Sequence, residues 1–238
     1  MSFNYSKGII WACAALLMLA VNAKSTNAAI VHESALLGET GLAPGSFDGS
    51  ALADFQFLGS RFTIGTTTQV TAIGGHILGF DQGQFGGVST LFGAIVPLPA
   101  ANAFPSFSPG ELESNAIAAT VFTPDPLNVT VDLLTPLSTT LSPGDYALIF
   151  GAGLFGAGTI QGAMPDNNTD LPGSSYFFCT PCGVGDSWLE DESTPYPANL
   201  RFVVEGTHVS EVPVPAAFPL LLGALTALGF FIRLRGKA

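Results

Sequence analysis

Hydrophobic residues follow two different patterns along this chain. Near the two ends they form unbroken runs, residues 9–21 and 212–232, and the second run contains 21 residues and no charge. Between the ends, short runs rich in Val, Ile, Thr and Phe are separated by Gly and Pro. Long uncharged runs indicate segments that enter a membrane, and short punctuated runs indicate strands of an antiparallel sheet.

The central region predicts seven strands and no long helix. The strands are expected at residues 53–64, 69–78, 88–96, 116–123, 128–134, 145–150 and 199–205. Apolar side chains alternate with polar ones in residues 54–57 and 128–133, which places them on one face of a strand. Residues 142–145, Ser-Pro-Gly-Asp, predict a turn that leads into the strand at 146–150.

These strands predict an all-β fold, a single antiparallel β-sandwich of the jelly-roll type. The chain has 19 Phe residues, nearly all of them in this region, and we expect them to fill the space between two sheets. Long surface loops are predicted at residues 97–109 and 166–173. The region spans about 180 residues, a length that suits one domain.

The N-terminal apolar run has the layout of a secretory signal peptide. Lys7 is the only charge in the first 23 residues, and the 13 apolar residues that follow it are short for a membrane span. Small residues at 21–23 predict cleavage after residue 23, and cleavage after 28 or 29 is the alternative. We therefore expect a signal peptide at 1–29, the β-sandwich at 30–211 and a C-terminal segment at 212–238. An uncleaved N-terminal anchor is the alternative.

Residues 30–211 are strongly acidic. All 18 Asp and Glu residues of the chain lie there, and Arg61 and Arg201 are the only Lys or Arg residues, so the formal charge of this region is −16. Such a surface repels nucleic-acid phosphates and anionic lipid headgroups, so we expect no nucleic-acid partner. We interpret the charge as a solvated acidic surface, with weak attraction for divalent cations as the alternative.

The C-terminal segment combines three features in a fixed order. A short motif, Val212-Pro213-Val214-Pro215-Ala216, begins an apolar run that would span roughly 30 Å as a helix. The basic residues Arg233, Arg235 and Lys237 follow the run and are expected to stay in the cytoplasm, so that the sandwich faces outward. The prolines favour extended backbone in the motif, the form that proteases bind.

This order of motif, transmembrane helix and basic cluster resembles the PEP-CTERM class of bacterial sorting signals. The resemblance covers 27 residues and is to the Val-Pro-Leu-Pro-Ala variant, with Val214 in place of the variant's Leu. It implies a Gram-negative exporter, processing by an exosortase-type membrane protease, and a place at the cell surface, in the envelope or in an extracellular exopolysaccharide matrix. An ordinary type I membrane anchor is the alternative, with the same topology.

Cys179 and Cys182 form a C-x-x-C motif and are the only cysteines left after signal removal. An exported chain meets an oxidising compartment, so we expect a structural disulfide. A redox pair usually starts a helix, whereas here a strand-like run precedes the motif and a loop follows it. A zinc site would need two more ligands from His32, His76 and His208, which are scattered along the chain.

Residues Asp166, Asn168 and Asp170 have the 1-3-5 spacing of a calcium loop. Leu171 and Phe177 stand where an EF-hand needs Gly and Glu, which excludes that motif. An Asx-rich turn is the favoured interpretation, and a looser calcium site, with calcium as the one candidate cofactor, is the alternative.

Aromatic and acidic residues gather in one stretch that could bind sugar. Trp188, Tyr176 and Tyr196 lie near Asp186 and Glu190 in sequence, and sandwich modules bind glycans by stacking exposed rings on them. Packing at the edge of the core is the alternative for these rings. An exposed Trp188 would favour sugar binding, and a buried one would rule out this form of it.

Catalysis has little support in the sequence, although a Ser-His-Asp triad assembled from distant residues stays open. It contains no G-x-S-x-G, no H-E-x-x-H and no phosphate-binding loop, and His76 has no carboxylate or nucleophile in local register. The G-x-G-x-x-G string at 151–156 predicts glycine turns in an antiparallel sheet. We therefore expect a non-enzymatic envelope or matrix protein, with a carbohydrate-binding module or adhesin on the same sandwich as the alternative.

Overall fold

The computed structural model describes residues 28–38, 49–79, 90–124, 132–190 and 199–209. The chain divides into two units, residues 1–207 and 208–238, and the fold below is that of the first unit. The predicted signal peptide and the predicted sorting segment lie outside the described residues, except for Ala28 and Ala29.

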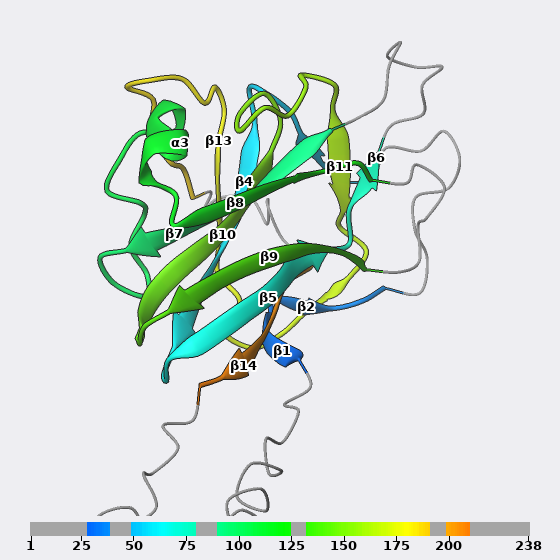
Figure 1. The fold of residues 1–238 in the computed structure, drawn as a ribbon. Helices are drawn as coiled ribbons and strands as arrows, with labels where there is room; N and C mark the ends of the chain where they lie inside the picture. Colours follow the sequence, from blue (N-terminus) through cyan, green and yellow to red (C-terminus); the bar gives the residue numbers. More distant parts are fainter. Residues whose placement is uncertain (1–27, 39–48, 80–89, 125–131, 191–198, 210–238) are drawn as a thin grey trace, which may run out of the picture. The chain divides into compact units, whose positions relative to one another are not determined.

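Two antiparallel sheets form a β-sandwich, which confirms the predicted fold class (Figure 1). The larger sheet has the order β13-β4-β10-β7-β8, and the smaller has the order β1-β14-β5-β9. The strands of the larger sheet are β13 (Tyr176–Cys179), β4 (Phe57–Ile64), β10 (Gly144–Gly151), β7 (Leu91–Leu98) and β8 (Ala118–Phe122). Those of the smaller sheet are β1 (Ala29–Glu33), β14 (Phe202–His208), β5 (Thr68–Gly75) and β9 (Leu133–Leu141).

Short elements complete the domain. A small sheet joins β3 (Gly49–Leu52), β11 (Gly162–Pro165) and β6 (Leu78–Gly79), and β12 (Thr169–Asp170) pairs with β2 (Ala35–Leu36). The helical segments in the described residues are η1 (Pro109–Glu111) and α3 (Leu112–Asn115). The predicted turn at 142–145 is confirmed, since β9 ends at Leu141 and β10 begins at Gly144.

One hydrophobic core lies between the two sheets. Alternate residues of β4 (Leu58, Phe62), β10 (Leu148, Phe150) and β7 (Leu91, Ile95) point into it, together with residues of β5, β9 and β14 from the smaller sheet. Both sheets therefore bury one face against the other, as alternating side chains in a sandwich require.

A second hydrophobic cluster covers the opposite face of the larger sheet. We call it the outer cluster. It contains Phe57, Phe92, Ala94, Val96, Leu98, Leu112, Ala147, Ile149, Ala157, Phe177, Cys179, Cys182 and Trp188, with Phe104, Phe107, Ala116, Ala119, Leu154 and Phe155 packed against them. The expectation that the Phe residues fill the space between the two sheets is therefore right for one group and wrong for another. Between the sheets lie Phe62, Phe122, Phe150, Phe178 and Phe202, and in the outer cluster lie Phe57, Phe92 and Phe177. The predicted surface loop at 97–109 places Phe104 and Phe107 on this cluster instead of only crossing the surface.

A close contact between two strands lies within the outer cluster. Gly59 of β4 pairs directly with Phe177 of β13, and a Cβ atom at residue 59 would lie 2.4 Å from the Phe177 ring. Because Gly59 has no side chain, the ring of Phe177 can lie directly over this part of β4. This arrangement also sets the position of Arg61, whose side chain follows on the same face of the strand.

Candidate functional site

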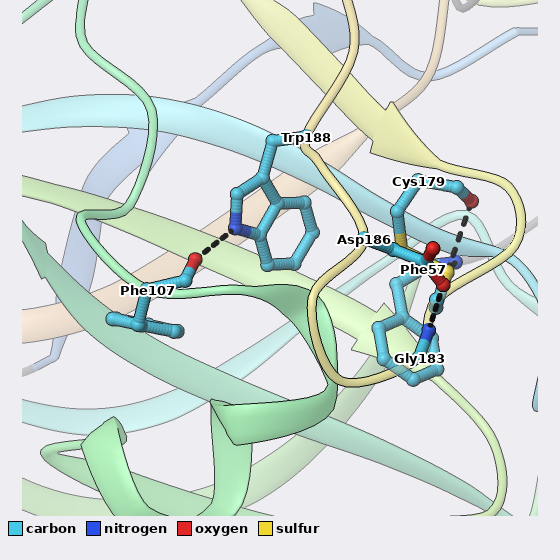
Figure 2. Close-up of a disulfide and its surroundings, with 7 residues drawn as sticks. Phe57, Phe107, Cys179, Gly183, Asp186 and Trp188 are labelled. Atoms are coloured by element: carbon cyan, nitrogen blue, oxygen red, sulfur yellow. Dashed lines mark hydrogen bonds between the residues drawn. A yellow bond between two sulfur atoms is a disulfide. The ribbon is translucent and has the colours of Figure 1, made fainter.

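The aromatic residues proposed to stack on sugar are buried. Trp188 is 6% exposed, and its indole N–H donates to the carbonyl oxygen of Phe107 at 2.8 Å (Figure 2). Its ring meets Phe177 edge to face, with the ring centroids 5.2 Å apart. Tyr176 is 9% exposed, and its hydroxyl donates to Asp170 and to the Leu200 carbonyl. The hypothesis that a sugar stacks on Trp188 or Tyr176 is therefore wrong. The third ring, Tyr196, lies outside the described residues.

The acidic members of that group serve the fold. The Asp186 carboxylate accepts the Gly183 N–H at 2.6 Å and so closes the turn after the C-x-x-C motif (Figure 2). Glu190 forms an ion pair with Arg61, with an N–O distance of 3.2 Å. Both carboxylates already have partners within the chain.

The predicted disulfide between Cys179 and Cys182 is confirmed. Both cysteines belong to the outer cluster, and the Phe57 N–H donates to Cys182 Sγ at 3.2 Å. The motif lies at the end of β13 and in the loop that follows, and no helix begins at it. This setting is that of a structural bridge rather than a helix-initial redox pair.

The loop at 166–170, interpreted from the sequence as an Asx-rich turn with a calcium site as the alternative, holds two parts of the domain together through Asn168. This side chain is 5% exposed. Its Oδ1 accepts from the Gly38 N–H and lies 3.0 Å from His76 Nδ1, and its Nδ2 donates to the carbonyls of Pro165 and Asn199. The Asp170 carboxylate accepts the Tyr176 hydroxyl, and Asp166 is exposed. Within the described ranges, no group of three or more His, Cys, Asp or Glu side chains is arranged to hold a metal ion.

Arg61 is buried on the outer face of β4. Its side chain lies between two aromatic rings, with Cζ 4.9 Å from the centroid of Phe104 and 5.0 Å from that of Phe177. The guanidinium donates to the Ala103 carbonyl at 2.9 Å and to the Ser175 hydroxyl at 2.7 Å, in addition to its ion pair with Glu190. One arginine thus connects three loops to the larger sheet.

Arg201, which precedes β14, is buried in the same way. It forms ion pairs of 2.8 Å with Asp132 and with Glu33, and its Nη1 also donates to the Ala35 carbonyl. Burial opposes the charged form, but hydrogen bonds to Asp132 and Glu33 outweigh it and raise the pKa of Arg201. Since Arg61 and Arg201 are the only Lys or Arg residues in 30–211, the domain surface presents carboxylates without exposed basic partners.

A pocket of about 240 Å³ lies where β1, β4 and two loops meet, and the sequence did not reveal it. We call it the edge pocket. It is lined by His32 and Glu33 of β1, residues 61–63 of β4, residues 101–102, and residues 172–175 that lead into β13. Four segments far apart in sequence contribute, so no local motif could have indicated it.

His32 stacks on Phe62 at the open edge of the sandwich. The two ring centroids are 5.2 Å apart with an interplanar angle of 20°, and Nε2 lies 3.4 Å from the Ser60 hydroxyl. This pair is not a nucleophile with its base, because Ser60 is fully buried and the distance is long for an activating hydrogen bond.

Burial lowers the pKa of His32 from 6.5 to about 4, against the opposing influence of Glu33. The unfolded chain therefore binds a proton at this residue more readily between pH 6.5 and 4. We expect the free energy of unfolding to fall by about 2 kcal/mol as the pH drops through this window. This is less than the whole pKa change would correspond to, because His32 is partly exposed and water screens its charge.

Denaturant titrations of the wild type and of His32→Phe at a series of pH values test this expectation. The Phe variant keeps the stacked ring and lacks the titrating group, so its stability should depend less on pH between 6.5 and 4. Parallel pH profiles of the two proteins would contradict the assignment.

The candidate residues of the sorting motif and the basic cluster lie beyond Val209 and outside the described residues. Among the residues that the structure describes, no helix is both long and apolar enough to cross a membrane. A scan against models of known protein families found no match to this chain, and a search of curated proteins found none either.

Proposed function

We propose that this chain is a non-enzymatic exported protein of the cell envelope or extracellular matrix. In this proposal the C-terminal segment holds the β-sandwich outside the membrane, and an exosortase-type protease then processes it. The observation that carries the proposal is the order of features at the end of the chain. The Val212–Ala216 motif begins a run of 21 uncharged residues, and Arg233, Arg235 and Lys237 follow that run.

Two features of the domain support export. The Cys179–Cys182 disulfide fits an oxidising compartment, because thiols in the cytosol are kept reduced. The domain surface is acidic, with both arginines buried in ion pairs, and it would repel the anionic surface of a membrane once released. Its attachment to a membrane would therefore depend on the C-terminal segment alone.

Cell fractionation of the native producer tests the role of the motif. A Pro213→Ala, Pro215→Ala variant removes the two prolines that favour extended backbone, so we expect it to accumulate uncut in the membrane fraction. The wild type should instead occur as a shortened form outside that fraction. A Val209→Ala, Ser210→Ala variant, changed just before the motif, is the matched control and should behave as the wild type. Equal distribution and equal length of all three proteins would contradict the proposal.

A further inference from the structure

The charged side chains that line the edge pocket are already neutralised. Glu33 forms an ion pair with Arg201, and Arg61 forms one with Glu190. An ionic ligand would have to compete with these pairs, and an anion would also approach a domain with a formal charge of −16. The pocket therefore favours a ligand without net charge.

The remaining polar groups of the pocket suit hydroxyl groups. His32 is neutral at pH 7, and because Nε2 faces the buried Ser60 hydroxyl, Nδ1 is the nitrogen that can form a hydrogen bond with a ligand. Asn102 is exposed at the rim and has an amide that both donates and accepts. The Ser175 hydroxyl accepts from Arg61 and can still donate its own proton. The Ser174 hydroxyl donates to two backbone carbonyls and can still accept. Such a mixture of neutral donors and acceptors suits a polyol, because each of its hydroxyl groups both donates and accepts hydrogen bonds.

The pocket also has an aromatic wall and a limited size. The ring of His32, stacked on the buried Phe62, lines one side, and aromatic side chains pack against the C–H groups of sugar rings. Its volume, about 240 Å³, lies below the range of about 300–1,000 Å³ that is typical for drug-sized ligands. A single ring fits this space better than an extended oligomer.

We propose that the edge pocket binds one neutral sugar unit, either free or at the end of a glycan chain. His32 and Asn102 would donate to and accept from its hydroxyls, and the ring of His32, stacked on Phe62, would pack against the sugar ring. This inference goes beyond the proposed function and does not depend on export or on processing of the C-terminal segment. It also assigns sugar binding to a different place from Trp188, which is buried.

Ligand-observed saturation-transfer NMR on the full chain tests the proposal. The protein is held in a detergent without a sugar headgroup, because such a headgroup would compete for the pocket. The probes are glucose, galactose and mannose, with glucuronate and glucosamine as charged counterparts of the same ring size. We expect saturation transfer to at least one neutral sugar and weaker binding of both charged ones.

Three variants locate the binding. Asn102→Ala removes an exposed amide at the rim, and His32→Phe keeps the stacked ring without its nitrogens. Each should weaken the binding of the neutral sugar about fivefold, the usual effect of losing one neutral hydrogen bond. Thr159→Ala removes an exposed hydroxyl outside the pocket and should leave binding unchanged.

Three outcomes would overturn the proposal. These are no saturation transfer to any neutral sugar at its highest soluble concentration, tighter binding of glucuronate or glucosamine, and binding that neither pocket variant weakens. Because Asn102 is exposed, the Asn102→Ala variant remains informative even if His32→Phe fails to fold.

Discussion

Replacing Arg201 with Met should lower the free energy of unfolding by about 3 kcal/mol. Arg201 is 5% exposed and forms ion pairs with Glu33 and Asp132, whose side chains are 29% and 19% exposed. The substitution leaves two partly buried carboxylates next to each other without a cation. The loss should be at the lower end for a broken buried pair, because water still reaches both carboxylates. Denaturant titration followed by circular dichroism measures it.

Two variants control for this effect. Arg201→Lys keeps the positive charge but cannot make the forked contact with Asp132, so we expect an intermediate loss of stability. Asp166→Asn changes the charge at an exposed position and should alter the free energy of unfolding by less than about 0.5 kcal/mol. Equal stability of Arg201→Met and the wild type would show that the two ion pairs do not stabilise the domain.

Replacing Trp188 with Ala should cost about 4 kcal/mol, the larger of the two effects. The indole fills part of the outer cluster against Phe177, and its N–H satisfies the Phe107 carbonyl at 2.8 Å. Removing the ring would leave a cavity beneath the loop that carries Phe107. The same titration by circular dichroism measures the loss of stability without depending on tryptophan fluorescence.

Trp188→Phe is the matched control, since it keeps a ring in the cluster and removes only the hydrogen bond and part of the volume. We expect it to cost less than half as much as Trp188→Ala. Substitution of an exposed side chain usually changes the free energy of unfolding by less than about 0.5 kcal/mol. A change that small for Trp188→Ala would contradict the burial of the indole.

Much of the sandwich could be predicted, because its longer strands alternate or lie between clear turn residues. The predicted strands at 53–64, 69–78, 88–96, 116–123, 145–150 and 199–205 all overlap observed ones. Two details were wrong. Residues 54–57 alternate like a strand, but Asp54 and Phe55 form a turn, and Phe55 is 46% exposed. Alternation over four residues is too short to separate a turn from a strand.

The strand predicted at 128–134 extends instead over Leu133–Leu141, and residues 128–131 lie outside the described part of the chain. Pro136 lies within this strand, although the predicted strand ended at residue 134. It is tolerated because β9 is the edge of the smaller sheet, so one side of the strand needs no pairing partner.

The outer cluster could not be predicted, because it depends on which loops fold over the larger sheet. Phe104, Phe177 and Trp188 come from three separate segments and meet only in the folded chain. In sequence, Trp188 beside an acidic run fits an exposed binding loop as well as a buried one. The disulfide, by contrast, was predictable, because Cys179 and Cys182 are the only cysteines outside the predicted signal peptide.

The two arginines were visible in the sequence but their role was not. A region with 18 acidic and two basic residues must place each cation near carboxylates, yet the choice of partners is non-local. Arg61 and Glu190 are 129 residues apart in the chain, and Arg201 and Glu33 are 168 apart. The edge pocket could not be predicted for the same reason. Its lining residues come together only because these long-range ion pairs hold β1, β4 and the loops in place.

The intact mass of the protein recovered from its native cells tests the central claim, processing at both ends, most directly. We predict a chain that begins after residue 23, 28 or 29 and ends at or near Val212–Ala216, without the segment 217–238. Its recovery outside the membrane fraction would agree with release. Protein that ends at Ala238 and stays in the membrane, with no shortened form, would contradict the account.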